Sequence, residues 1–335
     1  MSSPDPSDLY EAIRAEMEQV LIGNEDIVEG LAVALFTRGH VLLEGVPGVA
    51  KTTIANLFAR TSGLEYSRIQ MTPDILPADI TGTYIYREKT GEFELRRGPI
   101  FSNVVVADEI NRATPKTQSA LLEAMQEGRV TIENRTLDLP EPFMVIATQN
   151  PIEMEGTYTL PEAQRDRFQL KLTVDIPERE QESELLDQFD DAPELGPEVA
   201  ERVVTSAEIR DTREAVASVY VDDRIKAYVL DVVGATRDRA DLEYGASPRA
   251  SLAFLDTAKA RAAVHGRDYV IPDDIKALAE PILAHRLVRS TDAELSDISH
   301  VDIVADILAQ VEPPAAEAVT REAPAVRDGG DTPEE

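Results

Sequence analysis

The stretch Val41–Thr53 reads VLLEGVPGVAKTT. It predicts a short buried strand, a glycine-containing turn, and a helix that begins at Lys51-Thr52. A helix that starts directly after such a turn binds anions, because its backbone N–H groups converge on the ligand and its dipole adds about half a positive charge. The stretch therefore predicts a phosphate-binding loop in which Lys51 contacts the β- and γ-phosphates and the Thr52 hydroxyl binds Mg²⁺.

Position 50 departs from the usual form of this loop, G-x-x-x-x-G-K-[ST], because Ala50 stands in place of the second glycine. Alanine costs little there at negative φ and strains the loop at positive φ. An ordinary strand–turn–helix connection with a surface lysine is the structural alternative. The candidate residues for binding the nucleotide in this loop are Gly45, Val46, Pro47, Gly48, Val49, Ala50, Lys51, Thr52 and Thr53.

A second motif follows in Asn103–Asn111, which reads NVVVADEIN. Its three consecutive valines are typical of a parallel strand that is buried on both faces. Ligands bind at the carboxyl ends of such strands, where Asp108 and Glu109 lie. We expect Asp108 to hold the hydration shell of Mg²⁺ and Glu109 to polarise the attacking water, since phosphoryl transfer depends mainly on such positioning. Solvated acids at a strand end are the alternative.

A third apolar run, Phe143–Thr148 (FMVIAT), ends at Gln149-Asn150-Pro151. A polar amide at this strand end would lie beside the phosphate site. Asn150 is therefore the candidate for aligning a water molecule against the γ-phosphate, although Asn-Pro also commonly starts a turn. Earlier in the chain, Tyr66–Met71 predicts a further strand.

These motifs resemble Walker A, Walker B and sensor 1 of the AAA+ ATPases, and among them the MoxR subgroup. The resemblance covers roughly Leu9 to Val311. The alanine at position 50 is familiar in that subgroup. The segments that carry the resemblance are Glu44–Thr52 (EGVPGVAKT), Ala107–Ala113 (ADEINRA), Leu121–Gly128 (LLEAMQEG), Ala147–Pro151 (ATQNP) and Leu160–Phe168 (LPEAQRDRF).

The resemblance implies roles for arginines that their spacing alone does not assign. Arg167, in the Asp-Arg-Phe of the last segment, occupies the arginine-finger position. There it would reach the γ-phosphate of a neighbouring subunit and stabilise charge in the transition state. Arg165 lies two residues away, where the family usually has a non-basic residue, so it remains an alternative to Arg167.

Arg249, within Gly245–Ala250 (GASPRA), matches sensor 2 of the family. Ser247-Pro248 by itself predicts a helix start, in which Arg249 would be a solvated side chain of the first turn. A positive charge is unfavourable at a helix N-terminus, which favours the functional interpretation. The resemblance also implies that Ile22 and Gly23 contribute to the adenine pocket.

Two hairpin patterns interrupt the alternation of strands and helices. Thr81–Arg97 alternates apolar and polar residues around Lys89-Thr90-Gly91, and Arg129–Leu139 does so around Glu133-Asn134. The resemblance implies that both hairpins are inserts that line the central pore of a ring. Surface hairpins that cover sheet edges are the alternative.

The predicted fold class is α/β: a P-loop AAA+ core with a parallel sheet flanked by helices and two hairpin inserts, followed by an all-α lid domain. The predicted organisation is a flexible lead (1–8), the ATPase core (9–176), the lid (177–311) and a disordered acidic tail (312–335), which lacks bulky apolar residues. The helices expected in the lid are Arg179–Phe189, Ser206–Val219, Asp222–Arg239, Pro248–His265, Pro272–His285 and Ile298–Gln310.

Composition limits the classes of function. The 335-residue chain has no cysteine and four scattered histidines, which argues against disulfides and against thiolate or histidine metal sites. Its 63 acidic and 33 basic residues give a net charge of −30, which opposes nucleic-acid binding by the general surface. This acidity resembles that of proteins from halophiles, where salt screens the repulsion. With neither a spanning stretch nor a signal peptide evident, we expect a cytoplasmic protein.

Taken together, these features predict Mg²⁺-dependent hydrolysis of ATP by a homo-oligomeric ring, most simply a hexamer. The family's implied task is chaperone-like remodelling or activation of a protein complex, often through a partner with a von Willebrand factor A domain. Three alternatives stay open: a chelatase-type motor subunit, a nucleotide-gated binding module without turnover, and a nucleic-acid translocase. The translocase is supported by a local basic cluster of Arg87, Lys89, Arg96 and Arg97.

Overall fold

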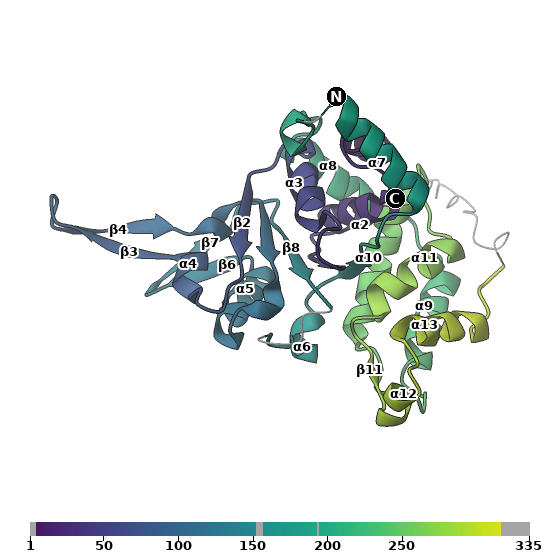
Figure 1. Ribbon diagram of the computed structural model, residues 1–335. Coiled ribbons are helices and arrows are strands. Elements are labelled where there is room, and N and C mark those ends of the chain that lie inside the picture. The colour runs from purple at the N-terminus through teal and green to yellow at the C-terminus, as the bar shows by residue number, and fades with distance from the viewer. Residues whose placement is uncertain (1–4, 152–156, 193, 316–335) are drawn as a thin grey trace, which may run out of the picture.

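The computed structural model describes residues 5–151, 157–192 and 194–315, so most of the predicted tail and the first four residues of the predicted lead lie outside the described residues. Residues 6–8 of that lead belong to the first helix, whose N-cap is Asp5. Within them, five strands form a parallel sheet in the spatial order β2-β5-β8-β1-β9 (Figure 1). These strands are β1 (Val41–Glu44), β2 (Tyr66–Gln70), β5 (Val104–Asp108), β8 (Met144–Gln149) and β9 (Leu170–Thr173). The predicted parallel sheet is confirmed.

Side chains of the central strands alternate between two hydrophobic clusters, one on each face of the sheet. Val104 and Val106 belong to the first cluster, whereas Val105 and Ala107 belong to the second. Because successive side chains of a strand point to opposite faces, a sheet covered on both sides requires an uninterrupted apolar run. Helices α2 (Glu25–Phe36) and α3 (Lys51–Thr61) cover the first face, and α5 (Pro115–Glu127) covers the second. Helix α1 (Pro6–Met17) packs on the outer side of α2 and α3.

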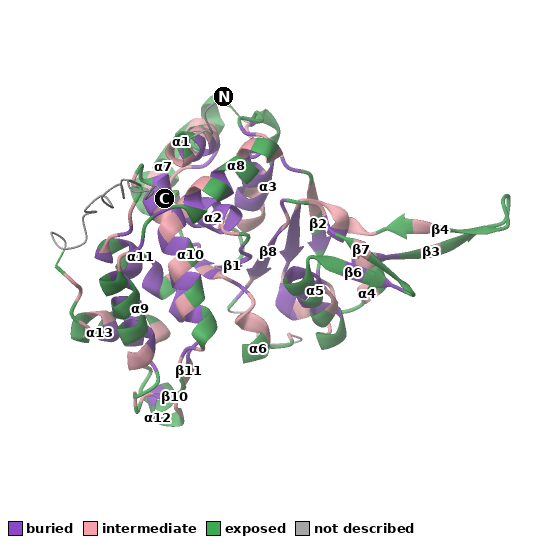
Figure 2. Ribbon diagram, turned by 180° about the vertical axis from the view of Figure 1, so that it is seen from behind, coloured by how far each residue is buried: buried purple, intermediate pink, exposed green. Residues whose placement is uncertain are grey.

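Both predicted hairpins are present. Strands β3 (Gly82–Arg87) and β4 (Glu92–Arg97) pair antiparallel and project away from the body of the molecule (Figure 1). Most of this hairpin is exposed (Figure 2). The second hairpin, β6 (Arg129–Ile132) with β7 (Arg135–Asp138), lies against the α/β core through Val130 and Ile132.

Short elements connect the core. They are α4 (Pro77–Thr81), α6 (Glu162–Arg165) and the 3₁₀ turns η1 (Pro99–Phe101), η2 (Ile110–Arg112) and η3 (Pro197–Val199). After β9 the chain is predominantly helical, as expected. Its helices are α7 (Arg179–Asp191), α8 (Ser206–Ala217), α9 (Asp223–Ala235), α10 (Pro248–Val264), α11 (Pro272–Leu283), α12 (Thr291–Leu295) and α13 (His300–Gln310).

The lid is not wholly helical, which corrects one detail of the prediction. Strands β10 (Leu242–Tyr244) and β11 (Val288–Arg289) pair antiparallel between the helices. Strands of two and three residues are too short to show an alternation of apolar and polar residues, so the sequence pattern does not predict them. Ser247 caps α10 with Pro248 in its first turn, as the sequence predicts.

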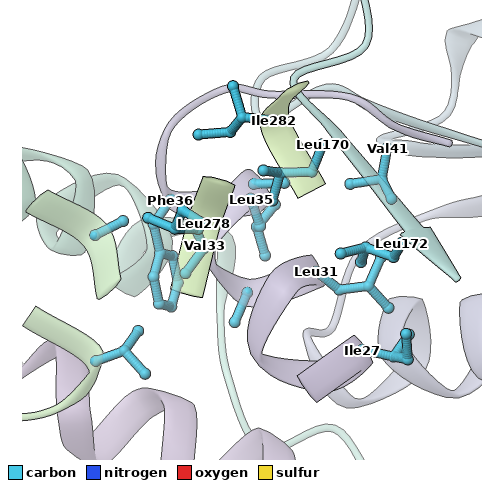
Figure 3. Packing of buried hydrophobic residues seen from close by; sticks show 14 of the residues in the cluster. Ile27, Leu31, Val33, Leu35, Phe36, Val41, Leu170, Leu172, Leu278 and Ile282 are labelled. Atoms are coloured by element: carbon cyan, nitrogen blue, oxygen red, sulfur yellow. The ribbon is translucent and has the colours of Figure 1, made fainter. Parts of the chain in front are cut away.

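The core and the lid share one hydrophobic cluster. Figure 3 shows Leu31 of α2 beside Leu172 of β9, and Leu278 of α11 beside Val33 and Phe36 of α2. Arg213 of α8 lies 5% exposed and donates two hydrogen bonds to the carbonyl of Leu35, at 3.0 and 2.8 Å. The predicted boundary near residue 177 is therefore crossed by packing, and the division into domains stays a prediction. Across the described residues, every helix is too short or too polar to cross a membrane.

Candidate nucleotide-binding site

The predicted phosphate-binding loop connects β1 to α3. A side chain on Gly45 would place its Cβ 2.4 Å from the carbonyl oxygen of Val174, so this position excludes larger residues. Gly48 has φ of +91° and Ala50 has φ of +63°. Ala50 therefore adopts the left-handed conformation that costs a non-glycine residue about 1 kcal/mol. The loop tolerates this strain at the residue that immediately precedes α3.

A cavity of about 450 Å³ opens beside this loop. Its lining comes from three places that lie far apart in the sequence: the loop with the start of α3, the end of β5, and the end of β8. The described residues that line it are Pro47, Gly48, Ala50, Lys51, Thr52, Thr53, Asp108, Glu109, Thr148, Gln149 and Asn150. The three predicted motifs therefore meet at the carboxyl edge of the parallel sheet, where such sheets bind ligands.

Lys51 lies over the loop that it follows. Its Nζ donates hydrogen bonds to the carbonyl oxygens of Gly45 and Val46, at 2.6 and 2.8 Å. The ammonium group therefore lies against the turn that the sequence predicts to bind phosphate. Asn150 follows β8 directly and is 5% exposed, so its amide belongs to the wall of the cavity.

Asp108 is 6% exposed and accepts hydrogen bonds from three neighbours. The Thr148 hydroxyl donates to Oδ1 at 2.6 Å, and the Thr52 hydroxyl lies 3.2 Å from Oδ2. The third neighbour is Arg68 of β2, whose Nε lies 3.1 Å from Oδ2. The facing Thr52 hydroxyl and Asp108 carboxylate are hard oxygen donors of the kind that Mg²⁺ binds together with phosphate and water. The donor set therefore fits the predicted metal.

Glu109 lies in a left-handed backbone conformation, with φ of +56°. Its N–H donates to the Thr148 hydroxyl at 2.9 Å. Its carboxylate accepts hydrogen bonds from Gln70 Nε2 and Arg112 Nη1, both at 2.9 Å. Both bonds reach the same oxygen, Oε2, so this oxygen of the candidate general base is bonded within its own subunit.

Four residues of this network were not among the predicted site residues: Arg68, Gln70, Arg112 and Thr148. Arg68 and Gln70 lie on β2, and Thr148 lies near the end of β8. Arg68 and Gln70 could have been found from the sequence, because they are the polar residues near the end of the predicted strand Tyr66–Met71. That strand ends at the same edge of the sheet as Asp108.

Arg167 follows α6 and is partly buried, with Nη1 donating to the Leu122 carbonyl at 2.6 Å. Arg249, in the first turn of α10, is half exposed and lies 3.9 Å from the carboxylate of Asp166. Neither arginine is among the described residues that line the cavity. The structure thus assembles Lys51, Thr52, Asp108, Glu109 and Asn150 around one cavity and leaves these two arginines outside it.

Asp166 connects the Arg167 segment to the lid. Its carboxylate accepts a hydrogen bond from Arg286 Nε at 2.8 Å and from the Ser247 hydroxyl at 3.1 Å. The Arg286 side chain is 3% exposed, and this burial lowers the pKa of its guanidinium. Asp166 therefore connects the segment between α6 and β9 by hydrogen bonds to the N-cap of α10 and to the residues that follow α11.

Comparison with known proteins gives matches over nearly the whole chain. A family model described as the ATPase family associated with various cellular activities matches residues 40–170, and one described as an AAA lid domain matches residues 234–307. Chaperone MoxR1 of Mycobacterium tuberculosis is 44% identical, over 92% of this chain and 83% of its own. The chain belongs to the MoxR family of AAA ATPases.

Two further proteins are similar to this chain over nearly its whole length. The uncharacterized protein YeaC of Bacillus subtilis is 45% identical, over 91% of this chain and 95% of its own. The crystal structure of a protein from Cytophaga hutchinsonii, described as a putative ATPase, superposes on this chain with a TM-score of 0.85 at 40% sequence identity. That superposition covers 92% of this chain and 96% of the other. The protein is therefore an ATPase with the AAA+ fold.

Two predicted adenine-pocket residues of this MoxR-family chain lie away from the phosphate cavity. Ile22 and Gly23 belong to the connection between α1 and α2 and are not among the described cavity-lining residues. Gly23 has φ of +70°, and a Cβ at this position would meet the Gln181 amide of α7 at 2.5 Å. The Gln181 side chain can move, so the positive φ is what favours glycine at this position, while the role of Ile22 and Gly23 in binding adenine stays a prediction.

Proposed function

We propose that this ATPase hydrolyses ATP with Mg²⁺ in the cavity beside the phosphate-binding loop. The observation that carries the proposal is the meeting of Lys51, Thr52, Asp108, Glu109 and Asn150 on one cavity. Phosphoryl transfer requires a phosphate cradle, oxygen ligands for a metal, and a group that orients water, and these five side chains supply them.

In this proposal the backbone N–H groups of the loop and the Lys51 ammonium bind the β- and γ-phosphates. Thr52 and Asp108 hold Mg²⁺, which when bound neutralises charge that develops on the phosphate oxygens. Glu109 leaves its hydrogen bonds with Gln70 and Arg112 and accepts the proton of the attacking water. Asn150 holds that water in line with the γ-phosphate.

We further propose that the site is completed by a neighbouring subunit in a ring, with six subunits as the simplest closed arrangement. Arg167 supplies positive charge to the neighbour's γ-phosphate, and Arg249 acts as sensor 2 from the lid. This is supported by the position of both arginines outside the cavity lining of their own subunit. Residues Ile22 and Gly23 would contact the adenine.

The proposed task of the ring is remodelling or activation of a protein complex in the cytoplasm, with a von Willebrand factor A domain protein as the expected partner. The long β3–β4 hairpin supports contact with a client, because it carries Tyr86 and Phe93 at 53% and 69% exposure. Exposed aromatic side chains on a projecting element are typical of binding surfaces. The chaperone name of a relative agrees with this task.

Subunit mixing tests the shared site. Lys51→Ala and Arg167→Ala chains should each be inactive, and their mixture should regain part of the ATPase activity, since hybrid interfaces contain one intact site. Arg165→Ala is the matched control and should keep its activity when measured alone. If the mixture stays inactive although the two chains co-assemble, a finger supplied by the neighbour is excluded. Loss of activity in Arg165→Ala with retention in Arg167→Ala would reassign the finger.

Glu109→Gln tests turnover itself. The amide keeps the size of the side chain and cannot accept a proton, so this variant should bind ATP while hydrolysing it at least about a hundredfold more slowly. A phosphate-release assay measures the rate, and proteins retained by the ATP-bound variant identify the client. Rapid hydrolysis by Glu109→Gln would show that another group activates the water.

A further inference from the structure

Residues 166–169 carry the proposed arginine finger and connect α6 to β9 without forming a helix or strand themselves. Arg167 Nη1 donates to the Leu122 carbonyl at 2.6 Å, while its Nε is buried without a partner among the described residues. Because the segment has no regular hydrogen-bond pattern of its own, the direction of Arg167 depends on what holds the residues on either side of it.

One guanidinium of the lid holds both sides. Arg286 Nε donates to Asp166 Oδ1 at 2.8 Å. Its Nη2 donates to the Phe168 carbonyl at 2.8 Å, and its Nη1 donates to the Gln169 carbonyl at 3.2 Å. Acceptors directly before and directly after Arg167 therefore converge on a single planar group.

The lid end of this contact is fixed as well. Arg286 Nη1 also donates to the Ile282 carbonyl of α11, and the neighbouring His285 Nε2 lies 3.0 Å from the Phe168 carbonyl oxygen. The Arg286 side chain is 3% exposed, and burial lowers the pKa of its guanidinium. Burying a charge stabilises a fold less than apolar packing does, but the fixed directions of the guanidinium N–H groups set an orientation.

This contact lies away from the nucleotide site of its own subunit. Neither Arg286 nor residues 166–169 are among the described residues that line the phosphate cavity. A change at Arg286 therefore leaves the cavity lining of its own subunit in place. What it alters directly is the placement of Arg167, which is proposed to serve the neighbouring subunit.

We propose that Arg286 is a positioning residue for Arg167: it holds residues 166–169 so that Arg167 reaches the nucleotide of the neighbouring subunit. The proposal rests on the shared site proposed above. Arg286 follows α11 of the lid, so the placement of the lid in one subunit controls hydrolysis in the next. Asp166 extends the link to α10, because the Ser247 hydroxyl donates to its Oδ2 at 3.1 Å.

Arg286→Lys tests the positioning role, because it keeps the charge and removes the planar group that bonds three acceptors of the segment at once. The turnover number should fall at least about tenfold, since a small misplacement of a group that acts in the transition state is costly. Affinity for a non-hydrolysable ATP analogue should stay within about twofold of the wild type, because the cavity is unchanged.

Arg289→Lys is the matched control for this substitution. Arg289 also belongs to the lid, but its partners are the Ile298 carbonyl and the Glu294 carboxylate, which are lid residues themselves. This variant should keep both the turnover number and the affinity of the wild type.

Subunit mixing shows on which side of the interface Arg286 acts. In a mixture with Lys51→Ala, the Arg286→Lys chain supplies an intact cavity and the Lys51→Ala chain supplies a correctly held Arg167. Activity should therefore recover as far as in the mixture of Lys51→Ala with Arg167→Ala. In a mixture of Arg286→Lys with Arg167→Ala, the finger is absent or misplaced at every interface, so activity should stay low.

The opposite pattern, recovery with Arg167→Ala and none with Lys51→Ala, overturns the proposal, because Arg286 would then act on the cavity of its own subunit. Failure of both mixtures in assembled chains, or wild-type turnover in Arg286→Lys alone, overturns it too. If Arg286→Lys does not assemble, the double variant Arg286→Gln/Asp166→Asn takes its place in the same mixtures, since it removes both charges and leaves neither buried without its partner.

The mixture of Lys51→Ala with Arg167→Ala separates this proposal from the one on which it rests. If that mixture stays inactive although the chains co-assemble, the proposed shared site itself fails. If it recovers and the Arg286→Lys mixtures do not follow the expected pattern, the shared site stands and the role of Arg286 fails.

Discussion

His40 should make the folded state sensitive to mild acid. The ring lies buried just before β1, 7% exposed, between two backbone partners. Nε2 lies 3.1 Å from the Met125 carbonyl oxygen and Nδ1 lies 3.0 Å from the Val145 nitrogen. A carbonyl needs a donor and an N–H needs an acceptor, so both contacts are satisfied by the neutral ring with its proton on Nε2. Burial lowers the pKa of His40 to about 4.

The sign and size of the effect follow from this shift. An unfolded histidine has a pKa near 6.5, so between about pH 6.5 and pH 4 the unfolded state binds more protons than the folded state. The contribution of His40 is therefore complete above pH 6.5 and is lost as the pH falls toward 4. At 1.36 kcal/mol per pKa unit, the total loss is about 3 kcal/mol, and about 2 kcal/mol of it occurs between pH 7.5 and pH 5.

Urea unfolding of wild type and His40→Gln at pH 7.5 and pH 5 measures this contribution. The glutamine amide can donate and accept, and it does not titrate. Burial also lowers the pKa of His285 and His300, so both proteins should lose stability in acid. The wild type should lose about 2 kcal/mol more than His40→Gln between the two pH values. Equal losses in the two proteins would refute the reasoning for His40.

Three further predictions concern stability. Ala50→Gly should raise the melting temperature of the nucleotide-free protein, because it removes about 1 kcal/mol of strain from the left-handed backbone at this residue. The greater entropy of glycine in the unfolded chain offsets part of this gain. An unchanged or lower melting temperature would contradict the prediction. Asp166→Asn should lower the free energy of unfolding by about 2 kcal/mol, since it removes the charged partner of buried Arg286; an unchanged urea midpoint would contradict this. Added KCl should raise the melting temperature up to molar concentrations, because it screens the repulsion of a net charge of −30; a flat or falling curve would exclude a halophilic surface.

The parts of the fold that could be predicted are those whose signal is local. The valines of β5 are continuous because both faces of the sheet are covered, and this pattern is visible in five consecutive residues. The loop before α3 is recognised by residue types at fixed spacing. Asp108, Glu109 and Asn150 could be placed because the ends of parallel strands lie at one edge. For these elements, neighbouring residues in the sequence determine the structure.

The contact of Glu109 with Gln70 could not be predicted because it depends on the pairing of strands that are distant in the sequence. Residues 66–70 read YSRIQ, and only Ile69 among them is buried. Alternation of this kind is typical of an edge strand with one solvated face, so Arg68 and Gln70 look like surface residues. Their partners are set by the register in which Gln70 lies opposite Asp108.

The position of β2 at the edge also explains why these side chains are available to the site. Central strands β1 and β8 are enclosed by neighbours, and their buried positions require apolar or short side chains. An edge strand has one open side, so it can carry a long guanidinium and a long amide without burying either charge or amide in the core. Arg68 can therefore reach Asp108 while half of its side chain remains in solvent. The exposure that makes Arg68 and Gln70 look like surface residues in the sequence therefore follows from the place of β2 at the edge of the sheet, beside the carboxyl end of β5.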